Sequence, residues 1–166
     1  MIITRTPFRV TLGGGGTDLS SYYSNHGGFI FSFTLDKYMY ITLKKAFADD
    51  FIRVKYSKSE TVSDLNELDH EIAQACLRKV GFSKGIEVAS MADIPSGSGL
   101  GSSSTYTVGL LSALHNLKRD FVSVQDLAEE ACEIEIDILK KPMGKQDQYL
   151  AAFGGLLVME ILKDGR

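Results

Sequence analysis

The sequence has few of the residues that cross-link small folds or build metal centres. It contains no tryptophan, three prolines, three histidines and two cysteines among 166 residues. Cys76 and Cys132 show no metal-ligand spacing, and the histidines show no mutual spacing that would indicate a metal site or a Ser-His-Asp triad. A disulfide framework is therefore not expected, and we predict a protein of the reducing cytoplasm.

Long apolar runs and an excess of basic charge are also missing. No apolar stretch approaches the about 20 residues that a membrane-spanning helix requires. The segment Met1–Val10 lacks the basic-then-apolar order of a signal peptide. The formal net charge of −3 gives no basis for non-specific binding to nucleic acid. We expect neither a membrane nor a nucleic-acid partner, and the sequence leaves the oligomeric state open.

The composition is that of one globular domain, with strand signals first and helix signals later. Apolar residues make up 44% of the chain and charged residues 23%. Strand-like segments are Ile2–Thr6, Phe8–Leu12, Phe29–Leu35, Tyr38–Leu43, Phe51–Tyr56, Gly85–Met91 and Gly155–Ile161. Helix-like segments are Asp64–Val80, Thr105–Leu117, Val124–Leu139 and Gln148–Phe153. This order predicts one α+β domain over residues 1–166, with helices packed on one sheet.

A loop of glycines and serines leads directly into the predicted buried helix at Thr105. It consists of Pro95, Ser96, Gly97, Ser98, Gly99, Leu100, Gly101, Ser102, Ser103 and Ser104. Glycines let the backbone approach a ligand closely, and a helix N-terminus offers free N–H groups and the positive end of a dipole. The loop therefore predicts a phosphate site, although a plain surface loop is the alternative. It has neither the lysine of a P-loop nor the spacing of a dinucleotide fingerprint.

The segment Thr6–Asp18 holds a second glycine cluster. It contains Arg9 and four consecutive glycines, Gly13–Gly16, which are followed by Thr17 and Asp18. Taken alone, the glycines predict a tight turn and Arg9 a surface arginine. The alternative is a small nest of backbone N–H groups that binds part of a substrate.

Two carboxylates in the last third of the chain stand out. At about 100° per residue, the helix Val124–Leu139 places Glu135 within its apolar arc. A buried carboxylate requires a cation or several donors, and spacing alone does not distinguish a metal ion from a lysine or arginine partner. Asp147 precedes the predicted helix Gln148–Phe153, where it could serve as an N-cap.

Together these segments resemble the signatures of the galactokinase, homoserine kinase, mevalonate kinase and phosphomevalonate kinase superfamily. The glycine-serine loop matches the superfamily's phosphate loop over nine consecutive positions. The first galactokinase signature lines up with Pro7, Arg9, Val10, Leu12, Gly14, Thr17 and Asp18, and the segment around Asp147 resembles the one carrying the catalytic aspartate. Gly15 and Gly16 stand where galactokinases have a Glu-His pair. In this glycine-rich segment the sequence is similar to the heptose 7-phosphate kinases. The matches span Thr6 to Gly155.

The resemblance implies a fold, a reaction and a set of site residues. The fold is the superfamily's N-terminal domain, similar to domain 2 of ribosomal protein S5. The reaction is transfer of the γ-phosphoryl group of ATP to the anomeric hydroxyl of D-glycero-D-manno-heptose 7-phosphate, for nucleotide-heptose and lipopolysaccharide or capsule synthesis. ATP would bind at Pro95, Gly97, Ser98, Gly99, Leu100, Gly101, Ser102, Ser103 and Ser104, and Mg²⁺ at Ser103 and Glu135. Asp147 and Arg9 would be catalytic, and the sugar phosphate would bind at Gly14, Gly15, Gly16, Thr17, Asp18 and Gln146.

Part of the superfamily pattern is not found. The third signature belongs to a C-terminal domain that closes the site, and we expect that domain to lie outside this chain. Three other interpretations stay open: another sugar 1-kinase acting on a fucose-like or galactose-like substrate, a non-catalytic relative that binds nucleotide or sugar, and an unrelated scaffold with a similar glycine loop.

Overall fold

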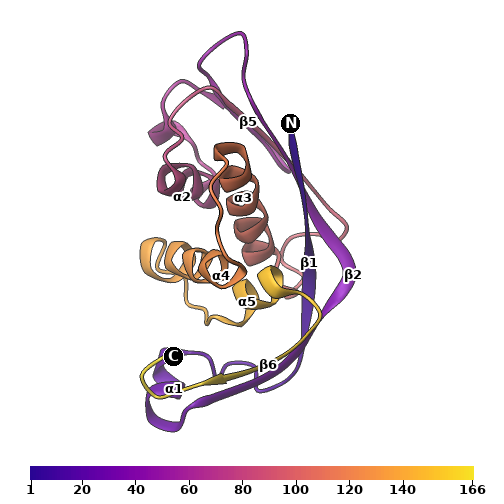
Figure 1. Cartoon of the computed structure of the whole chain (residues 1–166), viewed down its shortest axis with the longest axis vertical. Coiled ribbons are helices and arrows are strands. Elements are labelled where there is room, and N and C mark those ends of the chain that lie inside the picture. Colours follow the sequence, from indigo (N-terminus) through magenta and orange to yellow (C-terminus); the bar gives the residue numbers. More distant parts are fainter.

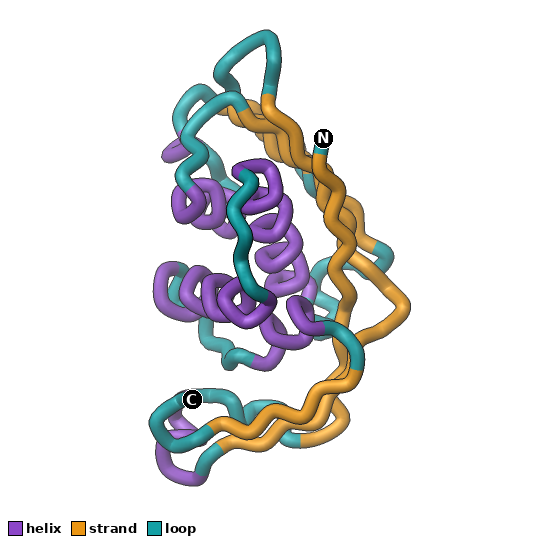
Figure 2. Tube along the Cα trace, viewed as in Figure 1, coloured by secondary structure: helices purple, strands orange, loops and turns teal.

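The computed structural model describes every residue from Met1 to Arg166. One mixed sheet carries the larger helices on one of its faces (Figures 1 and 2). Its strands are β1 (Ile2–Gly13), β2 (Gly28–Lys45), β3 (Ile52–Lys55), β4 (Ser59–Val62), β5 (Ile86–Ala92) and β6 (Leu156–Ile161). The helices are α1 (Ser20–His26), α2 (Glu71–Val80), α3 (Ser102–Lys118), α4 (Val124–Cys132) and α5 (Gln146–Phe153), with a 3-10 turn at Leu65–Glu67 and a π-helix at Glu133–Ile138. The predicted α+β class is confirmed.

The long strand β2 organises the sheet. The strands follow the order β1-β2-β5-β3-β4, and β6 pairs with β2 outside this path. The C-terminal part of β2 pairs with β5, whereas its N-terminal part, from Gly28 to Phe33, pairs with β6. Only β3 and β5 are parallel, so the sheet is mixed. No helix of the structure is long and apolar enough to cross a membrane.

Strand β2 differs from the sequence prediction, which placed two strands at Phe29–Leu35 and Tyr38–Leu43. The structure has one strand, because β1 runs alongside both parts. The register passes from Pro7 opposite Tyr38 to Arg9 opposite Thr34, so a bulge takes up the polar residues between the two parts. The gap between the two predicted strands is therefore a local irregularity within one strand.

The predicted helix Asp64–Val80 is divided in two by a pair of caps. The Asp64 side chain accepts a hydrogen bond from the Asn66 N–H, which closes the short 3-10 turn. His70 Nδ1 then accepts one from the Ala73 N–H at 3.2 Å, and α2 begins only at Glu71. Helix α1 and strand β4 were not predicted, because both are short and α1 buries none of its side chains.

Helix α3 lies against the sheet at the centre of the core. Ten of its residues are buried. Gly109 lets the helix approach β1, since a side chain there would lie 2.8 Å from the Thr6 hydroxyl oxygen. The Thr4 hydroxyl also donates to the Gly109 carbonyl at 2.9 Å. This close packing fixes the N-terminus of α3 beside the middle of β1.

Candidate active site

The glycine-serine loop ends in the first turn of α3. Gly97, Gly99 and Gly101 all have left-handed backbones, with φ of 79°, 76° and 83°. The helix begins at Ser102, three residues before the predicted Thr105, and no side chain caps it. The first-turn N–H groups of a helix have no partner within it. The loop therefore presents backbone donors, and its serine hydroxyls are available for other partners.

Arg9 and Asp147 form a two-pronged ion pair beside this loop. Arg9 Nε and Nη2 donate to the two Asp147 carboxylate oxygens at 2.6 and 2.7 Å. Arg9 Nη1 donates to the Gly99 carbonyl at 2.8 Å, and the Arg9 N–H donates to the Leu100 carbonyl at 3.3 Å. Strand β1, the loop and α5 thus meet at one point. Asp147 does not cap α5, because it lies inside the first turn and directs its carboxylate to Arg9.

Glu135 is fully buried, as its place in the apolar arc predicted. It lies on the π-helix that continues α4, where the sequence predicted an ordinary α-helix. Its carboxylate accepts hydrogen bonds from the hydroxyls of Ser103 and Ser104 and from Gln148 Nε2, the last at 2.8 Å. Lys141 Nζ lies 3.4 Å from Glu135 Oε1. Of the partners that the sequence allowed for Glu135, a lysine is therefore present. The site also contains hydroxyl and carboxylate oxygens of the kind that bind hard metal ions.

Asp18 is buried next to the start of α5. Its Oδ2 accepts a hydrogen bond from the Gln146 N–H at 3.1 Å, whereas its Oδ1 is buried without a partner. The Gln146 side chain accepts from the Thr11 hydroxyl at 2.7 Å. Gly144 passes so close to Asp18 that an added side chain would overlap the carboxylate. The first and third sequence segments are therefore joined at Asp18, and one of its carboxylate oxygens is buried without a hydrogen-bond partner.

Gly13 ends β1, and Gly14, Gly15 and Gly16 form the turn that leads towards α1. Gly14 has a φ of 79°, and a side chain there would overlap the Phe29 carbonyl. The Thr17 hydroxyl donates to the Gly14 carbonyl at 2.7 Å and accepts from the Phe29 N–H at 3.0 Å. Thr17, predicted to bind substrate, thus uses its hydroxyl to hold this turn. Gly15 has space beside it, with its nearest neighbour, the Thr11 methyl group, 3.6 Å from an added Cβ.

A cavity of about 510 Å³ opens beside the glycine-serine loop. His70 stacks on Tyr106 with ring centroids 4.7 Å apart, and the Tyr56 ring meets His70 edge-on at 4.5 Å. These three rings lie on its wall with Ser102 and apolar residues, among them Met39, Ile72, Ile94 and Pro95. The hydroxyls of Tyr106 and Ser102 are buried there without hydrogen-bond partners.

The protonation states in this cavity follow from burial. Burial lowers the pKa of His70, and its Nδ1 accepts the hydrogen bond from Ala73, so the ring is neutral with its proton on Nε2. Burial also raises the pKa of Tyr106, which keeps its hydroxyl protonated. The sequence gives no sign of this aromatic group, because its members come from three separate segments and none has a local signal.

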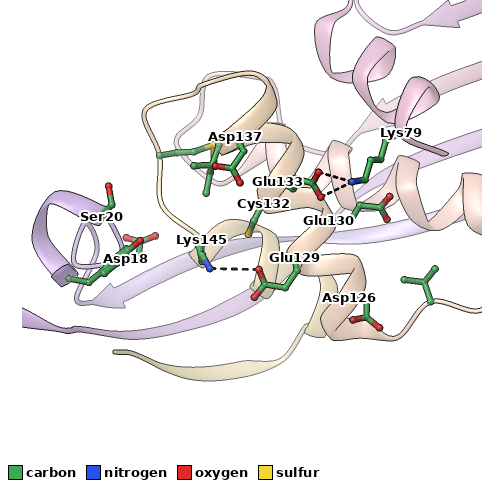
Figure 3. Close-up of a pocket in the computed structure, with 14 residues that line it drawn as sticks. Asp18, Ser20, Lys79, Asp126, Glu129, Glu130, Cys132, Glu133, Asp137 and Lys145 are labelled. Carbon is green, nitrogen blue, oxygen red and sulfur yellow. Dashed lines mark hydrogen bonds and ion pairs between the residues drawn. The ribbon is translucent and has the colours of Figure 1, made fainter. Parts of the chain in front are cut away.

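The largest cavity, of about 730 Å³, lies elsewhere, between Asp18 and the outer side of α4 (Figure 3). Its wall has more acidic than basic residues, and its two lysines are already paired, Lys79 with Glu133 at 2.6 Å and Lys145 with Glu129 at 3.7 Å. Of the predicted site residues only Asp18 lines it. A surface of this charge repels phosphate, so we place the site for the nucleotide's phosphates at the start of α3.

Comparison with known proteins agrees with this arrangement. The family described as GHMP kinases N terminal domain matches residues 67–155, more than half of the chain. A D-glycero-alpha-D-manno-heptose 7-phosphate kinase of Campylobacter jejuni is 33% identical over 99% of this chain and 52% of its own length. The crystal structure of a D-glycero-D-manno-heptose 1-phosphate kinase from Bacteroides thetaiotaomicron has a TM-score of 0.91 and 29% identity, covering 100% of this chain and 58% of that one. A sugar kinase structure from Campylobacter jejuni has a TM-score of 0.85 and 31% identity, covering 99% and 53%.

The chain belongs to the GHMP kinases and contains their N-terminal domain. Its relatives by sequence and by structure include kinases that act on heptose phosphates. The chain spans about half the length of the relatives it matches.

Proposed function

We propose that this chain supplies the ATP-binding and phosphoryl-transfer residues of a sugar kinase acting on D-glycero-D-manno-heptose 7-phosphate. The reaction phosphorylates the anomeric hydroxyl and gives the 1,7-bisphosphate, for nucleotide-heptose and surface polysaccharide synthesis. Family membership supports the kinase class. The names of two relatives support a heptose phosphate, although they differ in which phosphate the sugar carries.

The convergence of three segments at Gly101 carries the proposal. A side chain at Gly101 would lie 3.3 Å from both Arg9 Cγ and Asp147 Oδ2. The end of the phosphate loop, a fixed cation and a carboxylate are therefore in contact with one another. Phosphoryl transfer depends mainly on positioning and on charge stabilisation, and this arrangement offers both beside a helix N-terminus.

ATP would lie across the start of α3. The residues proposed for its phosphates are Pro95, Gly97, Ser98, Gly99, Leu100, Gly101, Ser102, Ser103 and Ser104. The adjacent cavity suits the nucleoside, because an apolar wall with a few fixed polar groups is the usual form of such a site. His70 Nε2 and the hydroxyls of Tyr106 and Ser102 are donors that a base or ribose could use.

The residues present fit a magnesium ion bound together with ATP. Mg²⁺ prefers oxygen ligands and commonly takes one or two from protein and the rest from phosphates and water. Ser103 Oγ and the Glu135 carboxylate are in hydrogen-bond contact and supply such a pair. No cluster of three or more acidic, histidine or cysteine side chains suitable for a metal is present, which is consistent with a shared rather than an all-protein site. When bound, the ion would neutralise charge on the β- and γ-phosphates.

Asp147 and Arg9 would act on the reacting groups. A carboxylate oxygen can accept more than one hydrogen bond, so Asp147 can bind Arg9 and also accept a hydrogen bond from the sugar hydroxyl. The new bond forms between the oxygen of the sugar hydroxyl and the γ-phosphorus as the bond from the γ-phosphorus to the β-phosphate oxygen breaks. ADP leaves, and the proton of the hydroxyl passes to Asp147. The guanidinium group of Arg9 offers a fixed fork of donors, which would stabilise the transferred phosphoryl group.

The sugar would lie on the Asp18 side of the ion pair. The free Asp18 Oδ1 is a buried acceptor suited to a sugar hydroxyl. Gln146 holds Asp18 in place through its backbone N–H. In the turn formed by Gly14, Gly15 and Gly16, the last two glycines have open space around them. Thr17 contributes indirectly by holding this glycine turn.

The test is coupled ADP release by the full-length protein with ATP and Mg²⁺. The substrates are D-glycero-D-manno-heptose 7-phosphate and, in parallel, galactose, fucose and mannose. Asp147→Asn is compared with Asp36→Asn, a change at an exposed aspartate on β2. We expect turnover on the heptose phosphate, a fall of about 10²- to 10⁴-fold in Asp147→Asn, and wild-type turnover in the control.

Other outcomes separate the alternatives. Turnover on a different sugar, lost in Asp147→Asn, would retain the kinase and refute the heptose phosphate. Binding of ATP without turnover on any sugar would support a non-catalytic relative.

A further inference from the structure

The ammonium group of Lys141 contacts the same two side chains that are proposed to bind the metal ion. Lys141 Nζ lies 2.9 Å from Ser103 Oγ and 3.4 Å from Glu135 Oε1. Ser103 in turn donates to that Glu135 oxygen, so the three groups form a closed triangle. The charge of the fully buried Glu135 is compensated in this structure by Lys141.

The backbone holds Lys141 in this position. The π-helix ends at Ile138, and Lys140 then adopts a left-handed backbone with φ of 54°, which is uncommon for a residue other than glycine. This turn brings the chain back, and the Lys141 N–H donates to the Glu135 carbonyl at 2.9 Å. Residues held in such a conformation persist only where the surroundings fix them, and they cluster at functional sites.

The Lys141 side chain can also leave. Its side chain is 27% exposed, whereas that of Glu135 is 0% exposed. A lysine is a point charge on a flexible stem, so it can withdraw towards solvent while its backbone stays in place. Glu135, with donors from Ser104 and Gln148, stays where it is.

We propose that Lys141 is a resident cation that occupies the divalent-cation position of the nucleotide-free protein and exchanges with the metal ion when it arrives with ATP. This inference rests on the proposed function, which assigns Ser103 and Glu135 to the metal. One carboxylate cannot balance an ammonium group and a divalent ion at the same point, because the two cations repel each other at this range. The exchange suppresses binding of free metal and makes metal binding dependent on the nucleotide's phosphates.

The experiment measures binding of Mn²⁺ by electron paramagnetic resonance, without nucleotide and with ATP, in the full chain. Lys141→Met removes the charge at similar volume, and Lys140→Met is the matched control on the neighbouring exposed lysine. Without nucleotide, we expect Lys141→Met to bind Mn²⁺ roughly tenfold more tightly than wild type, since a competing charge is gone. Lys140→Met should match wild type.

Thermal unfolding provides a readout that is independent of nucleotide. In EDTA, Lys141→Met should melt on the order of 5 °C below wild type, because Glu135 has lost its counter-charge. Added Mn²⁺ should restore most of that difference in Lys141→Met and change wild type little. Lys141→Gln, which can still contact Ser103, provides the same comparison if Lys141→Met does not fold.

The outcomes distinguish this inference from the proposed function. Mn²⁺ affinity in both Lys141 variants equal to or weaker than that of wild type would overturn the exchange. Glu135→Gln tests the site itself, because unchanged binding of Mn²⁺ with ATP in that variant would refute the metal assignment. Loss of binding in Glu135→Gln with no gain in the Lys141 variants would retain the metal site and reject the resident cation.

Discussion

Gly144 and Asp18 touch, although 126 positions separate them in the chain. A side chain at Gly144 would overlap the Asp18 carboxylate and approach its backbone carbonyl at 2.8 Å. Asp18 is buried and accepts a hydrogen bond from Gln146, so it has little freedom to move aside. The size of residue 144 thus controls where the Asp18 carboxylate lies.

Gly144→Ala should therefore displace Asp18. We expect a loss of stability of about 1–3 kcal/mol from overpacking, and weaker binding of the sugar phosphate with ATP affinity unchanged. Urea unfolding and calorimetric titration with each ligand measure the two effects. Gly13→Ala is the matched control, because an added Cβ there has no neighbour within 4 Å. Equal effects of the two substitutions would contradict the Asp18 contact as the cause.

Arg9→Lys tests the shape of the Arg9 side chain apart from its charge. Lysine cannot donate to both Asp147 oxygens and to the Gly99 carbonyl at once, as Arg9 does. We expect kcat to fall about 10²- to 10³-fold, with a small change in KM for ATP. Arg5→Lys, on the same strand and stacked over Tyr38, should leave kcat unchanged. Full activity of Arg9→Lys would show that a positive charge alone suffices.

Gly15→Glu places a carboxylate in the glycine turn. Gly15 has neither a left-handed backbone nor a close neighbour, so the side chain can be accommodated without strain. If the turn faces the substrate's own phosphate, the added negative charge should abolish heptose phosphate binding and leave ATP binding intact. Gly15→Ala separates the effect of charge from that of volume. Unchanged affinity for the sugar phosphate in Gly15→Glu would refute the nest at this turn.

The pKa of His70, lowered by burial, predicts a dependence of stability on pH. The unfolded chain binds a proton at His70 near its ordinary pKa of about 6.5, whereas the folded protein does so only at lower pH. Neutral His70 makes its full contribution to the free energy of unfolding above the pKa that it has in the unfolded chain. This contribution is lost as the pH falls through the pKa that it has in the folded protein. The Tm should decrease in this range.

His70→Asn keeps an acceptor for capping α2 but cannot titrate, so its Tm should depend less on pH below about 6.5. His26→Asn, at an exposed histidine at the end of α1, should keep the wild-type profile. Parallel Tm curves for all three proteins would exclude His70 as the source.

The sequence predicted the buried position of Glu135 but not its partner. Helical periodicity places Glu135 correctly, because the π-helix begins only at Glu133. Lys141 reaches it through the left-handed turn at Lys140, a departure that periodicity cannot anticipate. The resemblance, and not any spacing, associated Arg9 with Asp147, since 138 positions lie between them.

Other differences from the sequence prediction have local or tertiary causes. The caps at Asp64 and His70 divide a segment whose composition is helical throughout. The bulge in β2 lies in the gap between the two predicted strands. The aromatic group of Tyr56, His70 and Tyr106 forms only when three elements pack together, so no single segment of sequence indicates it.

The pairing of β6 with β2 has a consequence for the order of folding. Gly28 pairs with Ile161, so this end of the sheet closes a loop that includes every element from β2 to β6. Closing so long a loop costs more entropy than forming the nearer pairing of β2 with β5, and such contacts form late. Helix α5 directly precedes β6, so Asp147 should reach Arg9 among the last events of folding. Pulse-labelled hydrogen exchange during refolding should therefore show protection in β5 before β6, and the reverse order would exclude this sequence of events.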